Sequence, residues 1–279
     1  MYDFILNMIK TIMRGGNYDR VIPLLTDNFF QTYKGAWNII SGLSKSVAIP
    51  IAIMLVTLYF ILDVVEGSTS GQTFEKFLSS TLKYVFTLFF IFNAVTLLTY
   101  FVDLGRAVIA NSTATGLTDA QVEQKAVALM NEVFADGNDA KEAMAGEFKT
   151  VIILRSLQFV IPYLIMFFSQ FIMISMAYTR MIEIMVRIGF APIGFADIYT
   201  SGLSGGAGRY LRGFVAVCLQ GALMVASAVV VSSMVATALN PATGADGSVQ
   251  RLVQASIITF VGAGVTYKSQ EIARELLGA

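Results

Sequence analysis

Three charged side chains lie close together in an otherwise apolar part of the sequence. Arg180, Glu183 and Arg187 are spaced i, i+3 and i+7, which in a helix places them on one face and lets Glu183 pair with either arginine. A charge at the centre of a bilayer costs about 2.5 to 3.5 kcal/mol on insertion scales, so such residues pair, face a water-filled cavity or stay near the interface. Two interpretations follow: a surface helix with a solvated face, or a segment that lines a polar path or docks a partner.

Residues that interrupt helices follow the charged trio. Pro192, which is followed by Gly194, is expected to break or kink the helix and to leave a half-helix or re-entrant element. Asp197 could line a polar path or cap a helix end. The candidates for a path or docking site are therefore these seven residues: Arg180, Glu183, Arg187, Pro192, Asp197, Arg209 and Arg212.

Residue types that perform most enzymatic chemistry are missing. The chain has no histidine and one cysteine, Cys218, which removes Cys/His zinc sites, Ser/His and Cys/His nucleophilic pairs and disulfides within the chain. The HExxH string of zinc proteases, the GxGD string of intramembrane aspartyl proteases and a phosphate-binding Gly-Lys-Ser/Thr loop are also absent. We expect no enzymatic activity, no cofactor and no metal.

Composition indicates that the bilayer is the main solvent of this protein. Of 279 residues, 56% are apolar, and mean hydropathy is +0.68. Nineteen basic and nineteen acidic residues cancel, so no global positive field would attract nucleic acid. Any contact with nucleic acid would have to be local.

Uncharged runs predict an all-α, polytopic transmembrane helical bundle with five spans. A helix rises about 1.5 Å per residue and a hydrocarbon core is about 30 Å thick. The runs are 46–62, 84–102, 156–179, 213–239 and 252–267. A sixth span would follow if 181–199 also crosses, instead of re-entering or lying at the interface.

The N-terminal part predicts amphipathic helices. Residues 1–14 place Phe4, Ile5, Met8, Ile9, Ile12 and Met13 on one side. A second helix, with Thr26 as its expected N-cap, carries Phe29, Phe30, Tyr33, Trp37 and Ile40 on one face. These helices could pack on the protein's own core or lie in the membrane interface.

Four segments divide the chain: amphipathic helices at 1–45, a first transmembrane hairpin at 46–102, an extracytoplasmic helical loop at 103–155, and a bundle at 156–279 that contains the charged, Gly-rich segment 180–212. A capping pattern predicts a helix from Thr118, with Val122, Ala126, Leu129 and Val133 on one face. The arginines of 180–212 favour the cytoplasm for that segment, which places 103–155 outside, although the basic residues before position 46 would then also face outward.

Small residues recur along the last two uncharged runs, 213–239 and 252–267, where they would let helix backbones pack closely in lipid. The candidate packing positions are Gly213, Gly221, Ala222, Ala226, Gly262 and Gly264.

The order of features at 180–224 resembles the polytopic membrane subunit of type IV secretion systems, especially TrbL-like conjugal transfer proteins. The string RMIEIMVRIGFAPIGFADIYTSGLSGGAGRYLRGFVAVCLQGALM carries a charged helix, then Phe190 to Ile193, a Gly/Ser-rich loop, Tyr210 to Arg212 and a long apolar helix with Gln220. The hydropathy plan is also similar. The long soluble extensions of some members are missing from this sequence.

The resemblance implies a multi-pass subunit of the inner (plasma) membrane that helps to form the translocation path for DNA or protein substrate. It implies a homo-oligomer within a larger assembly, with other secretion-system subunits and separate cytoplasmic ATPases as partners, and contact with membrane lipid. Two other readings stay open at this stage. One is a secondary transporter or permease that uses Glu183, Arg187 and Asp197 at a broken helix, and the other is a purely structural scaffold.

Overall fold

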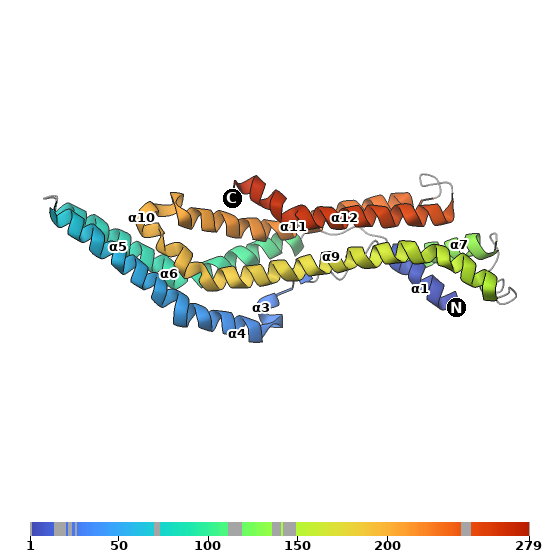
Figure 1. Ribbon diagram of the computed structural model, residues 1–279, viewed down its shortest axis with the longest axis horizontal. Coiled ribbons are helices and arrows are strands. Elements are labelled where there is room, and N and C mark those ends of the chain that lie inside the picture. Colours follow the sequence, from blue (N-terminus) through green and yellow to red (C-terminus); the bar gives the residue numbers. More distant parts are fainter. Residues whose placement is uncertain are drawn as a thin grey trace. The chain divides into compact units, whose positions relative to one another are not determined.

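A computed structural model describes residues 2–13, 21, 24–25, 27–69, 73–110, 119–135, 141, 149–240 and 247–278, and its regular elements are helices (Figure 1). The helices are α1 (Tyr2–Met13), α3 (Phe29–Thr32), α4 (Lys34–Leu43), α5 (Ile49–Thr69), α6 (Thr73–Ala110), α7 (Asp119–Ala135), α9 (Lys149–Ala196), α10 (Ile198–Ser201), α11 (Gly206–Ala238) and α12 (Ser248–Leu277). A π-helical turn, η1 (Ser44–Ala48), and a 3-10 turn, η2 (Gly202–Ser204), complete the set. The predicted all-α fold is confirmed.

Four helical stretches are long and apolar enough to cross a membrane: Lys34–Ser68, Phe74–Ile109, Ser156–Ala196 and Gly206–Ala238. They cover the first four predicted spans, the fourth of them up to Ala238, so the protein is a multi-pass membrane protein. The expected fifth span, 252–267, belongs to α12, which is not among the four stretches found in the described part of the chain. Arg251 and Lys268 flank its shorter apolar run, and the fifth crossing stays a prediction.

The second N-terminal amphipathic helix is not separate from the first span. Helix α4 passes through η1 directly into α5, so 34–68 is one continuous stretch. Thr26, the expected N-cap, lies outside the described residues, and α3 begins at Phe29 with Asn28 in the N-cap position. The side chains of Phe29 and Phe30 are buried, which favours packing on the protein's own core for this turn.

Helix α9 runs without a break through the segment where a break was expected. It has 48 residues, so at about 1.5 Å per residue it is far longer than a hydrocarbon core is thick. Pro192 is buried inside it, so the predicted break with a half-helix or re-entrant element is wrong, whereas a kink at this proline stays a prediction. Proline removes one intrahelical hydrogen bond, but Ala191 and Phe195 on either side are buried in a hydrophobic core that holds the chain helical. Residues 181–196 therefore continue the third span and do not form a separate sixth one.

The described chain forms two compact units, and the first contains α1 and α7. Helix α1 buries Ile5, Ile9 and Ile12, and it packs against α7. The expectation for Phe4 was wrong, because its side chain is 69% exposed while Leu6 is buried in its place.

Helix α7 has the amphipathic face that the sequence predicted. Val122, Ala126 and Leu129 are buried as expected, whereas Val133 is only half-buried and the neighbouring Phe134 is buried. Thr118, the expected start, lies outside the described residues, and the helix begins at Asp119.

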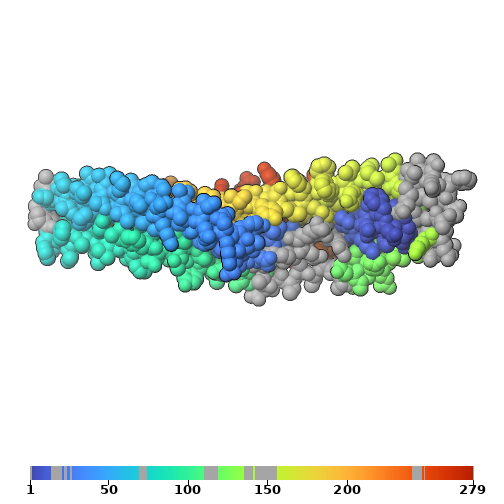
Figure 2. Space-filling model, turned by 90° about the horizontal axis from the view of Figure 1, so that it is seen from below, coloured from blue at the N-terminus to red at the C-terminus, as the bar shows by residue number. Residues whose placement is uncertain are grey.

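The second unit contains the α5–α6 hairpin, the end of α9 and the first half of α11. Figure 2 shows α4 and α5 lying along α6. The ring centroids of Phe60 and Tyr84 are 4.9 Å apart across this hairpin. Core residues come from all these helices: Ala52, Val56, Ile91, Ala94, Leu98, Ile184, Ile188, Phe195, Phe214 and Val217. The charged trio lies in this unit.

Candidate functional site

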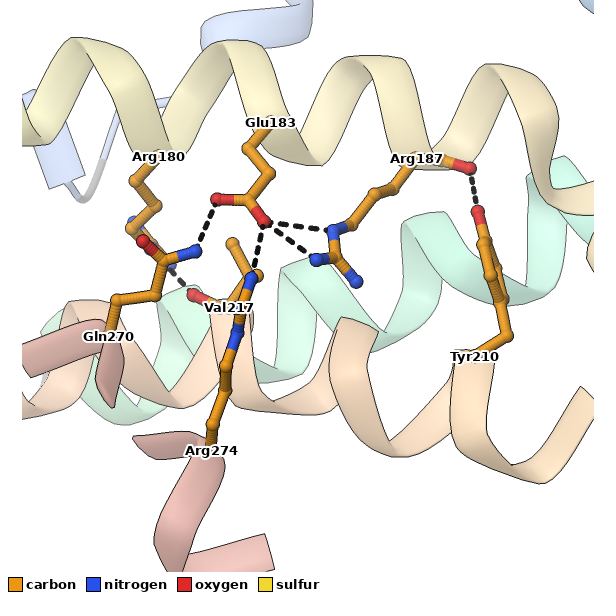
Figure 3. Close-up of polar contacts among 7 residues, drawn as sticks. All are labelled: Arg180, Glu183, Arg187, Tyr210, Val217, Gln270 and Arg274. Atoms are coloured by element: carbon orange, nitrogen blue, oxygen red, sulfur yellow. Dashed lines mark hydrogen bonds and ion pairs between the residues drawn. The ribbon is translucent and has the colours of Figure 1, made fainter. Parts of the chain in front are cut away.

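Glu183 forms an ion pair with Arg187 one turn further along α9 (Figure 3). The Nη2 and Nε atoms of Arg187 donate to Oε1 of Glu183 at 2.7 and 3.0 Å. Their side chains are only 22% and 23% exposed, so neither is a freely solvated surface charge. The i, i+4 spacing anticipated this pair.

Arg180 has a different partner from the one that its spacing suggested. Its Nε donates to the carbonyl oxygen of Val217 at 3.0 Å, and its Nη2 donates to that of Cys218 at 3.3 Å. The residue is 3% exposed, so its guanidinium is buried against the backbone of α11. Glu183 is therefore paired with Arg187, and Arg180 ties α9 to α11.

Gly221 makes the approach of Arg180 possible. A Cβ atom placed on Gly221 would lie 2.6 Å from Nη2 of Arg180 and would also overlap its Cζ. The predicted role of Gly221 in close helix packing thus has a specific partner here, the arginine of α9.

Helix α12 supplies two residues that the sequence did not single out. The Nε2 atom of Gln270 donates to Oε2 of Glu183 at 2.9 Å, and Nη2 of Arg274 lies 3.5 Å from Oε1 of Glu183. Figure 3 shows the side chains of Gln270 and Arg274 extending from α12 toward Glu183. Their i, i+4 spacing placed them on one face, but only the tertiary structure shows that this face meets α9.

The backbones of α9 and α11 are also joined beyond the charged trio. The hydroxyl of Tyr210 donates to the carbonyl oxygen of Arg187. A Cβ atom on Gly213 would lie 3.1 Å from Nη1 of Arg187, so the small residue leaves room for that guanidinium. We call Arg180, Glu183, Arg187, Gln270 and Arg274 the charged centre.

Asp197 organises the turn between α9 and α11. Its Oδ1 accepts from the Thr200 hydroxyl at 2.8 Å, and its Oδ2 accepts from the Ser201 hydroxyl at 2.7 Å and from the backbone N–H of Gly206 at 2.5 Å. These bonds, above all the one from Ser201, lower the pKa of Asp197 below its usual value. The side chain caps the first residue of α11, which is one of its two predicted roles, and a path-lining role stays a prediction.

A second polar cluster joins this turn to the hairpin. The Tyr199 hydroxyl donates to Oδ2 of Asp63 at 2.9 Å, and the Ser80 hydroxyl donates to the same oxygen. Burial, together with the hydrogen bond to Asp63, raises the pKa of Tyr199 to about 12, so the phenol stays protonated as a donor at neutral pH. The sequence reasoning missed this cluster because its members are separated in the chain, with Asp63 visible only as the charge that ends the first span.

The remaining candidates lie at the edges of the site or away from it. Arg209 and Arg212 are exposed, and Nε of Arg212 donates to the carbonyl oxygen of Gly208 at 3.4 Å. Among the predicted packing positions, Gly262 is buried, Ala222 and Gly213 are half-buried, and Ala226 and Gly264 are exposed. Exposed positions do not pack within this chain, so a packing role for them would require another molecule.

The fold and the charged centre define the class of protein. It is a multi-pass helical membrane protein in which one glutamate and three arginines connect three helices. The family model described as TrbL/VirB6 plasmid conjugal transfer like protein matches residues 29–192. The chain belongs to this family of conjugal transfer and type IV secretion membrane subunits, and other secretion-system subunits are its partners.

The matched region runs from α3 to Pro192 and so includes Arg180, Glu183 and Arg187. It ends before the Gly/Ser-rich turn and α11, which carried much of the resemblance noted in the sequence. No curated protein matches the chain. No solved structure matches it either.

Proposed function

We propose that this protein is a channel or scaffold subunit of a type IV secretion apparatus in the inner (plasma) membrane, where it contributes to the translocation path for DNA or protein substrate. The observation that carries the proposal is the family match over residues 29–192, which includes the charged helix. The protein acts without catalysis of its own, as a homo-oligomer, beside separate cytoplasmic ATPases.

The charged centre is the element that we assign to this role. Glu183 holds Arg187, Gln270 and Arg274 at once, so one carboxylate fixes the relative positions of α9 and the end of α12. Partly buried charges inside long apolar helices are costly unless they pair or serve a polar path. We therefore expect substrate passage or partner docking to depend on Glu183, whereas membrane insertion does not.

The geometry does not favour the transporter alternative. That reading required a helix broken at Pro192, with Glu183, Arg187 and Asp197 at its free ends. Helix α9 is continuous to Ala196, and Asp197 is engaged in capping α11. The scaffold reading differs from the channel reading only in whether substrate contacts the charged centre.

Conjugative transfer by the Glu183→Gln variant tests the proposal. Loss of the carboxylate charge leaves Arg187 and Arg274 facing each other without a counter-charge, so we expect transfer to fall about tenfold or more, with protein level and membrane fraction near those of the wild type. Glu271→Gln is the matched control, because Glu271 is exposed on the same turn of α12 as Gln270.

The exchange variant with Glu183→Arg and Arg187→Glu should recover part of the transfer if local pairing is what matters. Wild-type transfer by Glu183→Gln would show that transfer does not depend on the charge of Glu183, and the assigned role of the centre would be wrong.

A further inference from the structure

One face of α6 stays exposed along most of the helix. Its members recur at spacings of three, four or seven residues, which in a helix places them in one stripe. The exposed members are Leu78, Leu82, Phe89, Asn93, Thr96 and Tyr100. The opposite face carries Ile91, Ala94 and Leu98, which are buried in the hydrophobic core. We call the six exposed residues the α6 stripe.

Asn93 places a polar carboxamide in the middle of this stripe. It is the midpoint of the uncharged run 84–102, so it lies near the centre of the bilayer when that run crosses. A carboxamide has two N–H donors and one oxygen acceptor. In the described part of the chain it makes one hydrogen bond, from Nδ2 to the carbonyl oxygen of Phe89 at 2.8 Å. One N–H and the Oδ1 acceptor are left, and lipid tails offer them no partner.

The surface beside Asn93 is hollowed. The hollow has a volume of about 460 Å³, and the described residues that line it lie on α6 between Phe89 and Leu104. Most of its lining is apolar, and Asn93 and Thr96 add polar groups to it. Side chains of one helix pack into hollows of this kind on another helix, and small or hydrogen-bonding residues at the contact hold the two together in lipid. The stripe therefore has the shape and the chemistry of a helix-packing surface.

We propose that α6 of a second copy of this chain packs in parallel along the α6 stripe, with the carboxamides of the two Asn93 residues hydrogen-bonded to each other. A carboxamide is both donor and acceptor, so it is complementary to itself. Copies inserted in one membrane have the same orientation, so their Asn93 side chains lie at the same depth. A single asparagine within an apolar stripe fixes the register of two packed helices. The inference rests on the homo-oligomer of the proposed function and names an interface for it.

Cross-linking between copies tests the interface. In a Cys218→Ala background, which removes the natural thiol, the full-length Thr96→Cys variant is reconstituted in phosphatidylcholine liposomes and oxidised with copper phenanthroline. We expect a disulfide-linked dimer as the main product. Met54→Cys is the matched control, because Met54 is 73% exposed and lies within the uncharged run 46–62 but on α5. It should give at least about fivefold less dimer.

A second measurement tests the carboxamide itself. Copies labelled at the C-terminus with donor or acceptor dyes are mixed in liposomes, and energy transfer is followed as lipid dilutes the protein. Asn93→Leu should weaken association about tenfold, which corresponds to about 1.4 kcal/mol. Asn93→Gln keeps a carboxamide and should recover most of the association. Because Asn93 is exposed on the single chain, thermal unfolding in detergent should match the wild type for both variants.

Three results would overturn the interface. The first is an equal dimer yield from Thr96→Cys and Met54→Cys, which would indicate random collision. The second is unchanged association of Asn93→Leu. The third is a Thr96→Cys product that forms only in cells with the whole secretion apparatus and does not have the mass of two copies, which would identify another subunit as the occupant.

The interface and the transfer role can fail separately. Any of these three results, with transfer still lowered by Glu183→Gln, would leave the proposed function standing. A Thr96→Cys dimer together with wild-type transfer by Glu183→Gln would support the interface and remove the role assigned to the charged centre.

Discussion

Substitution of Gly221 by alanine tests whether Arg180 requires an open surface on α11. The new Cβ atom would lie 2.6 Å from Nη2 of Arg180, inside van der Waals contact. Because this side chain is 3% exposed, it has little room to move sideways, and it must give up one or both bonds to the carbonyl oxygens of Val217 and Cys218. We expect Gly221→Ala to destabilise the protein.

The size of the effect follows from two opposing contributions. A hydrogen bond to a charged group contributes about 1.5 to 3 kcal/mol, so loss of one of the two bonds of Arg180 costs about that much, and loss of both costs about twice as much. Replacing glycine by alanine within a helix stabilises the helix by about 1 kcal/mol. The expected net loss for Gly221→Ala is therefore about 0.5 to 2 kcal/mol if one bond is lost, and more if both are lost.

Thermal unfolding in lipid nanodiscs measures this loss against a matched control. Gly264→Ala makes the same chemical change on α12 at a position where a Cβ atom meets nothing within 4 Å, so it should be neutral or slightly stabilising. A double-mutant cycle then isolates the cause: in an Arg180→Met background, Gly221→Ala should cost much less. If Gly221→Ala is as stable as the wild type, or costs the same with and without Arg180, the argument is refuted.

Three other measurements test separate parts of the structure. A cysteine at Asn131 on α7 should react with an impermeant thiol reagent added to intact cells, and labelling only after lysis would mean that the topology is inverted. Asp197→Asn should lower stability at pH 7, and its difference in stability from the wild type should shrink below about pH 4. The pKa of Asp197 is lowered in the folded protein, so its stabilising contribution is present above 3.8, the pKa of the unfolded chain, and is lost as pH falls through the pKa of the folded protein. A difference in stability that does not change with pH would contradict the capping role. Ala226→Leu should reduce the size of the assembled complex while the isolated chain stays as stable as before, because Ala226 is exposed on this chain; unchanged complex size and transfer would place it against lipid.

Local and compositional features were predictable from the sequence because they depend on nearest neighbours along the chain. Uncharged runs gave the first four membrane spans, since length and hydropathy alone decide whether a helix can cross a bilayer. The i, i+4 spacing anticipated the pair of Glu183 with Arg187 in the same way. The capping preference of aspartate was one of two roles predicted for Asp197.

Where local preference competes with packing, the tertiary structure decided the outcome. Proline disfavours a helix interior, yet α9 continues through Pro192 because buried neighbours such as Phe195 stabilise it. Spacing alone allowed Arg180 to pair with Glu183, but Arg180 instead donates to the carbonyl oxygens of Val217 and Cys218 on another helix. Gln270 and Arg274 reach Glu183 across 87 and 91 positions of sequence. Composition and spacing thus determined the spans and the local pair, whereas the membership of the charged centre depends on which helix faces meet, and that is set by the packing of the whole chain.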